Sequence, residues 1–218
     1  WWRSVASETN ITHGQRLWLY TLAFIIMCLL VIPTVIVIPM SFSESQYLEF
    51  PPSQWSFRWY NEYLETPRWI KATITSFKVA SLTMLVATPL GTMAAYGLFV
   101  SGSRIGKAVF FLLMTPMIVP VILIAIGTFY VFGKVGIVNT TLGLVMAHTV
   151  LSVPIVMIII TSALRTYDLN QERVAQSLGS TRVRAFFEIT LPQLKFSIFT
   201  AALLAFLTSF DEVIISIF

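Results

Sequence analysis

Residues 17–40 read LWLYTLAFIIMCLLVIPTVIVIPM, a run that contains no charged side chain. A helix needs about 20 apolar residues to cross the hydrocarbon core of a bilayer, so this run is long enough to do so. Pro33 and Pro39 lie in its second half, where a membrane helix tolerates a kink if neighbouring groups satisfy the freed carbonyls. The run therefore predicts a transmembrane helix.

Further apolar blocks show that the rest of the chain is built in the same way. They cover about residues 72–100, 108–132, 137–164 and 196–218. Charged residues make up 11% of the 218 residues, whereas a soluble domain carries about 25%. We therefore predict an all-α, polytopic transmembrane helical bundle with five spans. Its first part, residues 1–71, holds one span and an outer loop, and residues 72–218 form the core.

The connection between the first two blocks, residues 41–71, is rich in aromatic side chains. It holds Trp55, Trp59, Tyr60, Tyr63 and Trp69. Such rings favour the interface between lipid and water, so we predict an extramembrane loop with a short interfacial helix. The alternative is a solvent-exposed loop with a small core of its own.

Basic residues gather in three other connections: Arg3 and Arg16, then Arg104 and Lys107, then Arg165, Arg173, Arg182, Arg184 and Lys195. If every block spans the bilayer, these three segments share one side, which the positive-inside rule assigns to the cytoplasm. The acid-rich first loop, Lys134 and the C-terminal residues then lie outside. Although the net charge is +4, the basic residues form no single patch, so we expect lipid contact and no nucleic-acid partner.

Residues 165–195 form an amphipathic segment before the last block. Asp168 is placed to cap a helix starting at Leu169, with Gln171 as its capping-box partner. Val174, Ala175 and Leu178 give that helix an apolar face.

Gly179 then stops this helix, as a residue in the left-handed conformation does. Ser180 or Thr181 can cap a second short helix, which we expect to end before Pro192. The pattern predicts a cytoplasmic helix–glycine–helix elbow that acts as a knob for a partner's groove. The alternative is an ordinary pair of interfacial amphipathic helices.

The elbow resembles the EAA loop of ABC importer permeases. That loop reads E-A-A, three residues, Gly, nine residues and then I-x-L-P. Here Ala175, Gly179 and Ile189-Thr-Leu-Pro192 keep the spacing without a gap. Arg173 and Val174 stand where the family has Glu and Ala, and Glu172 lies one position before the usual Glu.

The resemblance covers residues 72–218 and implies a type I permease of the bacterial cytoplasmic membrane. Its expected partners are two cytoplasmic ATP-binding subunits, a second permease subunit and an extracytoplasmic solute-binding protein. The resemblance implies that the elbow docks on an ATP-binding subunit through Glu172, Val174, Ala175, Leu178, Gly179, Ile189, Leu191 and Pro192. Such permeases usually have six spans, so a sixth is expected after residue 218.

The resemblance also implies that this chain is not itself an enzyme and binds no cofactor, since ATP and Mg are held by the partner ATPase. The segment Gly102-Ser-Arg-Ile-Gly106-Lys107 is one residue short of a P-loop and lacks the Ser or Thr after the lysine. We interpret it as a turn that carries cytoplasmic charges. Cysteine and histidine residues show no clustering at the spacing of a metal site.

Asp211 and Glu212 lie in the last apolar block, where a carboxyl group is costly and suggests a function. Thr208, Ser209 and Ser216 fall on the same helical face as Glu212, which makes a polar stripe. Such a stripe suits a cationic or amine-bearing solute. Two alternatives remain: a structural hydrogen-bond cluster, and a helix that already ends near residue 211.

The segment Ser209-Phe-Asp-Glu-Val213 resembles the S-F-D-[DE] stretch of spermidine/putrescine permeases. Pro89-Leu-Gly-Thr-Met-Ala-Ala-Tyr96 and Arg58-Trp-Tyr60 are also similar to that subfamily. The resemblance implies a polyamine solute, although permeases with the same pattern also take opines, amino-acid derivatives or ferric iron.

Two other classes of protein remain possible from the sequence. A stand-alone secondary transporter should show an inverted repeat, and the sequence has no clear one. A membrane-embedded enzyme needs a compact catalytic cluster at one interface, which the sequence does not reveal.

Overall fold

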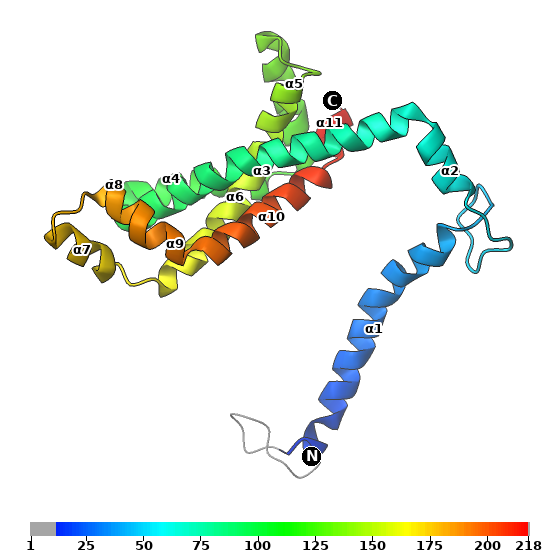
Figure 1. Ribbon diagram of the computed structural model, residues 1–218, viewed down its shortest axis with the longest axis horizontal. Helices are drawn as coiled ribbons and strands as arrows, with labels where there is room; N and C mark the ends of the chain where they lie inside the picture. The colour runs from blue at the N-terminus through cyan, green and yellow to red at the C-terminus, as the bar shows by residue number, and fades with distance from the viewer. Residues whose placement is uncertain (1–11, 218) are drawn as a thin grey trace. The chain divides into compact units, whose positions relative to one another are not determined.

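A computed structural model describes residues 12–217 of the chain (Figure 1). Regular structure in this range is helical, and β pairing among these residues is limited to an isolated bridge between Ser43 and Trp55. The chain divides into two compact units, residues 1–71 and residues 72–218. Arg3, which the charge pattern assigns to the cytoplasm, lies outside the described residues. The predicted all-helical class is confirmed.

The first unit consists of a long apolar helix followed by a loop and a short helix. The 3-10 turn η1 (Gly14–Arg16) leads into α1 (Leu17–Met40), which contains Pro33 and Pro39. The aromatic-rich connection then forms α2 (Arg58–Glu65). The sequence thus predicted both the first apolar helix and the presence of a short helix in the outer loop.

The loop between α1 and α2 is held by aromatic packing and by one carboxyl group. The ring of Phe42 stands edge-on to that of Phe57, with 5.5 Å between their centroids. The Glu49 carboxylate accepts hydrogen bonds from the hydroxyl and backbone N–H of Ser53 and from the Ser43 hydroxyl. These donors, Ser53 first, hold the pKa of Glu49 below its usual value. The loop therefore has a small cluster of its own in addition to the predicted helix.

The second unit is a helical bundle. Its helices are α3 (Pro67–Ser101), which begins shortly before the unit, α4 (Arg104–Ile118), α5 (Val121–Val135), α6 (Thr141–Thr166), α7 (Asn170–Ser177), α8 (Arg182–Ala185), the π-helical turn η2 (Phe186–Thr190), α9 (Leu191–Gln193), α10 (Lys195–Phe210) and α11 (Ile214–Ile217). Figure 1 shows α7 at one end of the bundle and α11 at the other.

Helices α6 and α10 pack closely and form the centre of the bundle. Ala201 and Ala205 of α10 are fully buried in one cluster with Val156 and Ile160 of α6. Small side chains let two membrane helices approach closely, which compensates for the weak hydrophobic drive inside a bilayer. Helix α3 also approaches α6 closely at a small residue, since a Cβ atom on Gly91 would lie only 2.6 Å from Val156 Cγ1.

Within residues 12–217, three helical segments are long and apolar enough to cross a membrane alone: residues 14–40, α3 and α6. Two bent pairs raise the number of possible spans to five. Helices α4 and α5 meet at 103°, and residues 182–193 meet α10 at 77°. The predicted block at 108–132 is therefore a sharply bent pair of helices, and the five predicted spans are reached only if each bent pair is one span. Pro120 disfavours the helical conformation at Val119, whose ψ is 132°, and α5 begins after the proline.

Candidate functional site

The elbow begins close to the predicted position but with different capping. Helix α7 follows Leu169, and Asp168 Oδ1 accepts a hydrogen bond from the Asn170 N–H at 2.9 Å. The predicted capping box is wrong, because the Gln171 side chain instead accepts a hydrogen bond from the Gln193 amide. This bond joins the two arms of the elbow.

Gly179 turns the chain at the end of α7, as the sequence predicts. Its φ is +95°, a conformation that residues with a side chain rarely adopt. The Gly179 N–H donates to the Gln176 carbonyl at 3.0 Å, and the Ser180 N–H donates to the Ala175 carbonyl at 3.0 Å. These two bonds make a Schellman motif, which satisfies carbonyls that the helix end leaves free.

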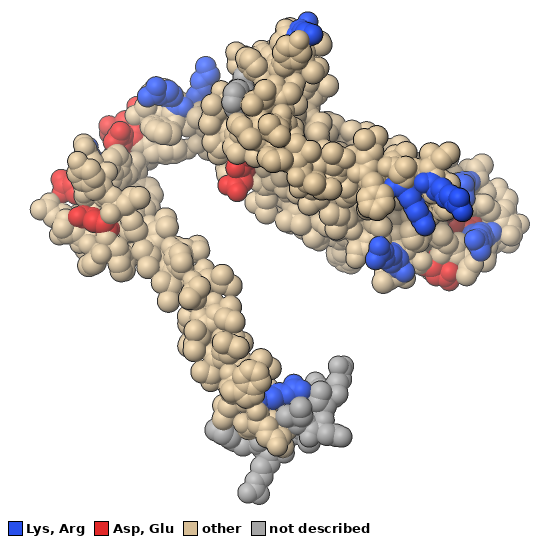
Figure 2. All heavy atoms as spheres, turned by 180° about the vertical axis from the view of Figure 1, so that it is seen from behind, with Lys and Arg blue, Asp and Glu red and all other residues tan. Residues whose placement is uncertain are grey.

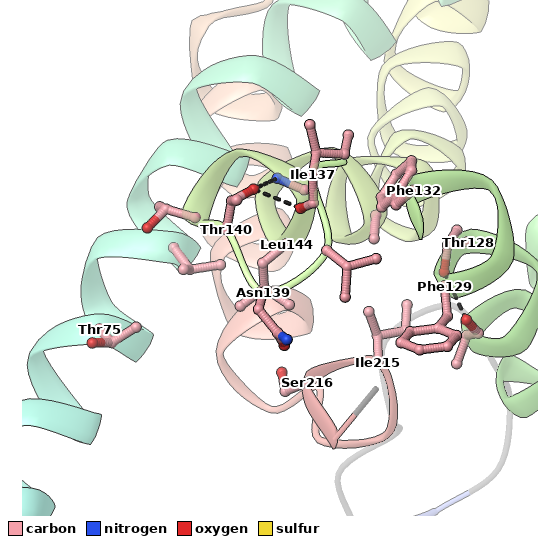
Figure 3. Close-up of a pocket in the computed structure, with 16 residues that line it drawn as sticks. Thr75, Thr128, Phe129, Phe132, Ile137, Asn139, Thr140, Leu144, Ile215 and Ser216 are labelled. Atoms are coloured by element: carbon pink, nitrogen blue, oxygen red, sulfur yellow. Dashed lines mark hydrogen bonds between the residues drawn. The ribbon is translucent and has the colours of Figure 1, made fainter. Parts of the chain in front are cut away.

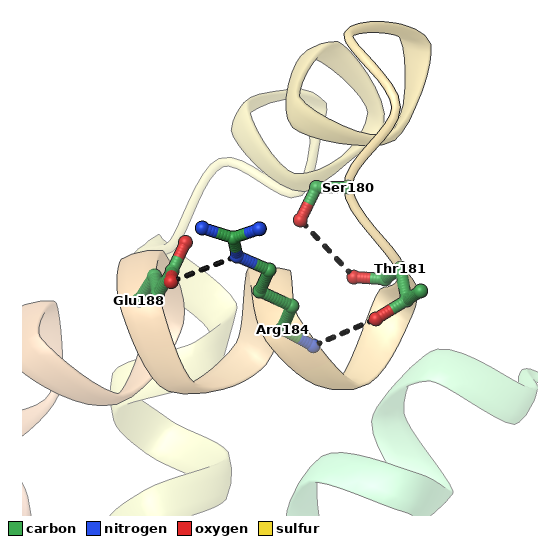
Figure 4. Close-up of polar contacts among 4 residues, drawn as sticks. All are labelled: Ser180, Thr181, Arg184 and Glu188. Atoms are coloured by element: carbon green, nitrogen blue, oxygen red, sulfur yellow. Dashed lines mark hydrogen bonds and ion pairs between the residues drawn. The ribbon is translucent and has the colours of Figure 1, made fainter.

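The second arm starts with a side-chain cap, shown in Figure 4. Of the two predicted residues, Thr181 is the cap: its hydroxyl accepts from the Arg184 N–H at 3.3 Å. Ser180 instead directs its hydroxyl to the Thr181 carbonyl at 3.4 Å. One turn later, Arg184 Nε pairs with Glu188 Oε1 at 2.9 Å on the exposed side of the arm.

The second arm does not end before Pro192, so that prediction is wrong. The chain widens into the π-turn η2 and continues as α9 through Pro192 to Gln193. Proline lacks an N–H and crowds the preceding turn of an α-helix, and a π-turn relieves this by spacing its hydrogen bonds more widely. The bend toward α10 comes only after Gln193.

Glu172 is the buried centre of the elbow, with a side chain 3% exposed. Its Oε2 accepts from the Tyr96 hydroxyl of α3 at 2.7 Å, and its Oε1 accepts from the Thr190 hydroxyl of η2. Because Thr190 gives its single proton to Glu172, the Tyr167 hydroxyl must donate to Thr190 Oγ1, which lies 2.9 Å away. Burial raises the pKa of Tyr167, so this phenol keeps its proton.

The opposite side of the elbow presents apolar side chains to the surroundings. Val174 is 59% exposed and Leu178 is 84% exposed on the first arm, and Val183 and Phe187 are exposed on the second. We call these four residues the elbow knob. Basic side chains gather at the same end of the unit (Figure 2).

The structure separates the members of the predicted coupling set. Gly179 and Pro192 are exposed, as are Val174 and Leu178 of the elbow knob, whereas Ala175, Ile189 and Leu191 are half-buried. Glu172 faces inward, toward Tyr96. Val183 and Phe187 were not predicted to be exposed. The second helix was expected to end before Pro192, and this expectation did not indicate which of its side chains share an exposed face.

The segment with the incomplete P-loop spacing is a turn. Gly102 has a φ of +55°, and the Ser103 hydroxyl accepts from the Gly106 N–H at 2.9 Å, which caps α4. The contact between Tyr96 and Glu172 puts the nearby end of α3 beside the elbow. The two basic connections of the second unit therefore lie at the same end, as the charge pattern predicts.

The predicted polar stripe of the last block is not a continuous helical face. Helix α10 ends at Phe210, Asp211 is exposed and Glu212 is half-buried. The Glu212 carboxylate accepts from the Ile215 N–H at 3.1 Å at the start of α11, and its carbonyl accepts from the Ser216 hydroxyl at 3.0 Å. The last apolar block is therefore not one continuous helix. The alternative of a helix ending near residue 211 is confirmed, and such an end keeps two carboxyl groups out of a continuous apolar helix.

Two other members of the stripe point in different directions. The Thr208 hydroxyl donates to the carbonyl of Leu204 at 2.8 Å, within its own helix. Ser209 is buried, and its hydroxyl lies 2.8 Å from Nδ1 of His148 on α6. Ser209 thus joins two helices, which agrees with the alternative of a structural hydrogen-bond cluster.

A cavity of about 240 Å³ opens among α3, α5, α6 and α11, at the end of the bundle away from the elbow (Figure 3). Its polar lining is neutral and includes Thr75, Asn139 and Ser216. Asn139 has a φ of +59°, which is uncommon for a residue with a side chain. The residues that line this cavity come from four separate segments, so no local sequence pattern predicts it.

Comparison with known proteins gives consistent matches. A family model described as "Binding-protein-dependent transport system inner membrane component" matches residues 87–218. The putrescine transport system permease protein PotI of Escherichia coli is 29% identical over 216 residues, which cover 96% of this chain and 76% of PotI. The spermidine/putrescine transport system permease protein PotC of Haemophilus influenzae is 30% identical over 89% of this chain and 76% of PotC.

A third relative is the molybdenum transport system permease protein ModB of Escherichia coli, which is 32% identical over 68% of this chain and 70% of ModB. These relatives are named for different solutes and share the permease role, which agrees with the family match. The chain therefore belongs to the inner membrane components of binding-protein-dependent transport systems, the permease subunits of ABC importers, and is a polytopic protein of the bacterial cytoplasmic membrane.

Proposed function

We propose that this chain forms half of the solute pathway of an ATP-driven importer and docks on its ATPase through the elbow knob. The observation that carries the proposal is the exposure of Val174, Leu178, Val183 and Phe187, on a segment that the positive-inside rule assigns to the cytoplasm. Exposed apolar side chains rimmed by polar residues mark interaction sites. The Schellman turn at Gly179 fixes the two arms, so the knob is formed before a partner binds.

The partners follow from this role. Two cytoplasmic subunits bind ATP and Mg and hydrolyse the nucleotide, while this chain holds neither and performs no catalysis. A second permease subunit, identical or homologous, completes the pathway. An extracytoplasmic solute-binding protein delivers the solute to the end of the bundle that carries the cavity and Asp211.

We propose a polyamine as the solute. Two of the relatives are named for putrescine or spermidine, and both align with about nine-tenths or more of this chain. Asp211 and Glu212 stand at the end of α10 away from the elbow, where carboxylates can pair with amines through charge-assisted hydrogen bonds. These two residues thus act at the entrance of the pathway.

The test is ATP hydrolysis by the complete complex in proteoliposomes. Binding protein loaded with putrescine or spermidine should stimulate hydrolysis, and molybdate should not. Stimulation by another solute class alone would overturn the polyamine assignment and leave the importer role intact. Failure of the ATPase subunits to co-purify with the chain would overturn the docking role.

A further inference from the structure

The hydrogen bonds around Glu172 join segments that are far apart in the sequence. Tyr96 belongs to α3, which crosses the bilayer, whereas Glu172 and Thr190 belong to the two arms of the elbow. The Tyr96 hydroxyl and the Thr190 hydroxyl each donate to one oxygen of the same carboxyl group. One buried side chain therefore connects both arms of the elbow to a transmembrane helix.

Further contacts make this connection stiff. The ring of Tyr96 packs on the ring of Phe186 of the second arm, with 4.5 Å between their centroids. Tyr167, directly after α6, donates to Thr190 and so adds a second long helix to the network. Hydrogen bonds to charged acceptors are stronger than neutral ones, and burial excludes the water that would compete for them.

We infer that Glu172 is a positioning residue that links the elbow to α3, so that the two move as one body when the ATPase moves the elbow. The inference rests on the proposed docking role and adds a route for the movement. The exposed side of the elbow meets the partner, and the buried side passes the displacement to α3 through the Glu172–Tyr96 hydrogen bond. Allosteric coupling requires such a physical link between two sites.

The test measures the distance between the elbow and α3 by pulsed electron paramagnetic resonance. Spin labels replace Gln176 on α7 and Met93 on α3, in a Cys28→Ser background and with the labelled chain diluted into unlabelled chain. In the complete complex we expect one narrow distance distribution that is the same without nucleotide and with ATP and vanadate. A distance that changes with nucleotide in the otherwise unaltered chain would overturn the link.

Tyr96→Phe removes one donor to Glu172 and keeps the ring, so the distribution should broaden and should shift when ATP is added. Stimulation of ATP hydrolysis by the loaded binding protein should fall about tenfold, as expected for one lost hydrogen bond to a charged group. An unchanged distribution in this variant would contradict the link. Tyr60→Phe, which removes a hydroxyl bonded to Ser41 in the outer loop, is the matched control and should leave both readings unchanged.

Substitutions at position 172 distinguish a specific link from general folding. In Glu172→Gln the side-chain oxygen can accept from Thr190 while its amide donates to the Tyr96 hydroxyl, so the narrow distribution should persist. Glu172→Ala loses both bonds and should behave like Tyr96→Phe. Broadening of equal size in Glu172→Gln would overturn the link.

The docking role is tested separately from the link between the elbow and α3, by co-purification of the ATPase subunits. If the ATPase never co-purifies, the docking proposal fails, but the distribution in the nucleotide-free chain still tests the link. If Tyr96→Phe abolishes co-purification while the original chain retains it, Tyr96 acts by folding the elbow, and the link is overturned.

Discussion

At the elbow, the Glu172 carboxyl group is buried and accepts hydrogen bonds from two hydroxyl groups. At the other end of the same unit, Asp211 is exposed, and Glu212 is half-buried beside a short terminal helix. The elbow closes its polar groups on one another and leaves apolar side chains outside. The other end keeps the Asp211 carboxyl group accessible and adds a cavity with a neutral polar lining. The first arrangement suits transmission of movement from a protein partner to the helical bundle, and the second suits a passing solute.

The largest expected effect comes from Gly179→Asp, which should abolish uptake and co-purification of the ATPase. A residue with a side chain rarely adopts a φ of +95°, so the turn must change its backbone conformation, and the two arms then lose the relative placement that forms the elbow knob. Ser177→Asp is the control, because it adds the same charge two residues earlier on an ordinary helical backbone. Normal uptake by the Gly179 variant in membrane vesicles would contradict the importance of the elbow turn.

Leu178→Ser should weaken docking without altering the fold. A central apolar contact in an interface is worth about 2 kcal/mol, so affinity for the ATPase should fall about thirtyfold. The measurement is binding of the purified ATPase to permease in nanodiscs. Leu112→Ser on α4 changes an exposed leucine away from the elbow and should not alter affinity. Equal effects at the two sites would remove Leu178 from the interface.

At the outer end, the double variant Asp211→Asn and Glu212→Gln should reduce putrescine uptake several-fold while the ATPase still docks. The effect is smaller because Asp211 is exposed and interacts with a cation through water, and the Glu212 carboxylate already accepts a hydrogen bond from the Ile215 N–H. Uptake is measured with radiolabelled putrescine in proteoliposomes. Glu188→Gln removes one acid at the elbow end and is the control. Undiminished uptake in the double variant would exclude both residues from the pathway.

The smallest effect is expected for the ion pair between Arg184 and Glu188, whose side chains are 69% and 57% exposed. Exposed pairs at this helical spacing contribute about 0.5 kcal/mol or less. Arg184→Gln should therefore lower the thermal unfolding midpoint in detergent by about 1 °C. A shift of several degrees would mean that the second arm depends on this pair for its fold.

The sequence predicted the features that depend on local chemistry. The left-handed glycine at 179, a cap at Ser180 or Thr181 and the short helix of the outer loop each follow from residue types within a few positions. The break after Ile118 was missed and the end of α10 at Phe210 was left as one alternative, because hydropathy is continuous across both positions while the backbone is not. The burial of Glu172 was missed for another reason: its partners lie 76 and 18 residues away along the chain.

The candidate site shows the same difference between features set by local sequence and features set by distant contacts. The sequence placed the elbow and named Val174 and Leu178, which the structure exposes. It could not assign Val183 and Phe187, because the widened turn before Pro192 changes which side chains share a face. The outer cavity brings together residues from four segments, and tertiary contacts of this kind leave no periodic signal in the sequence.

The π-turn at Phe186–Thr190 has a consequence for how such a chain can change. A π-turn holds one more residue than the α-helical turn it replaces, so deleting one residue here restores regular winding. The deletion would therefore leave the arm before it facing about the same way, whereas loss of one residue from an ordinary α-helical turn rotates one side by about 100°, the angle that separates successive residues. A one-codon loss between 186 and 190 would then keep Val183 on the exposed face, whereas the same loss within the regular helix α10 would rotate Ala201 out of register with Ala205.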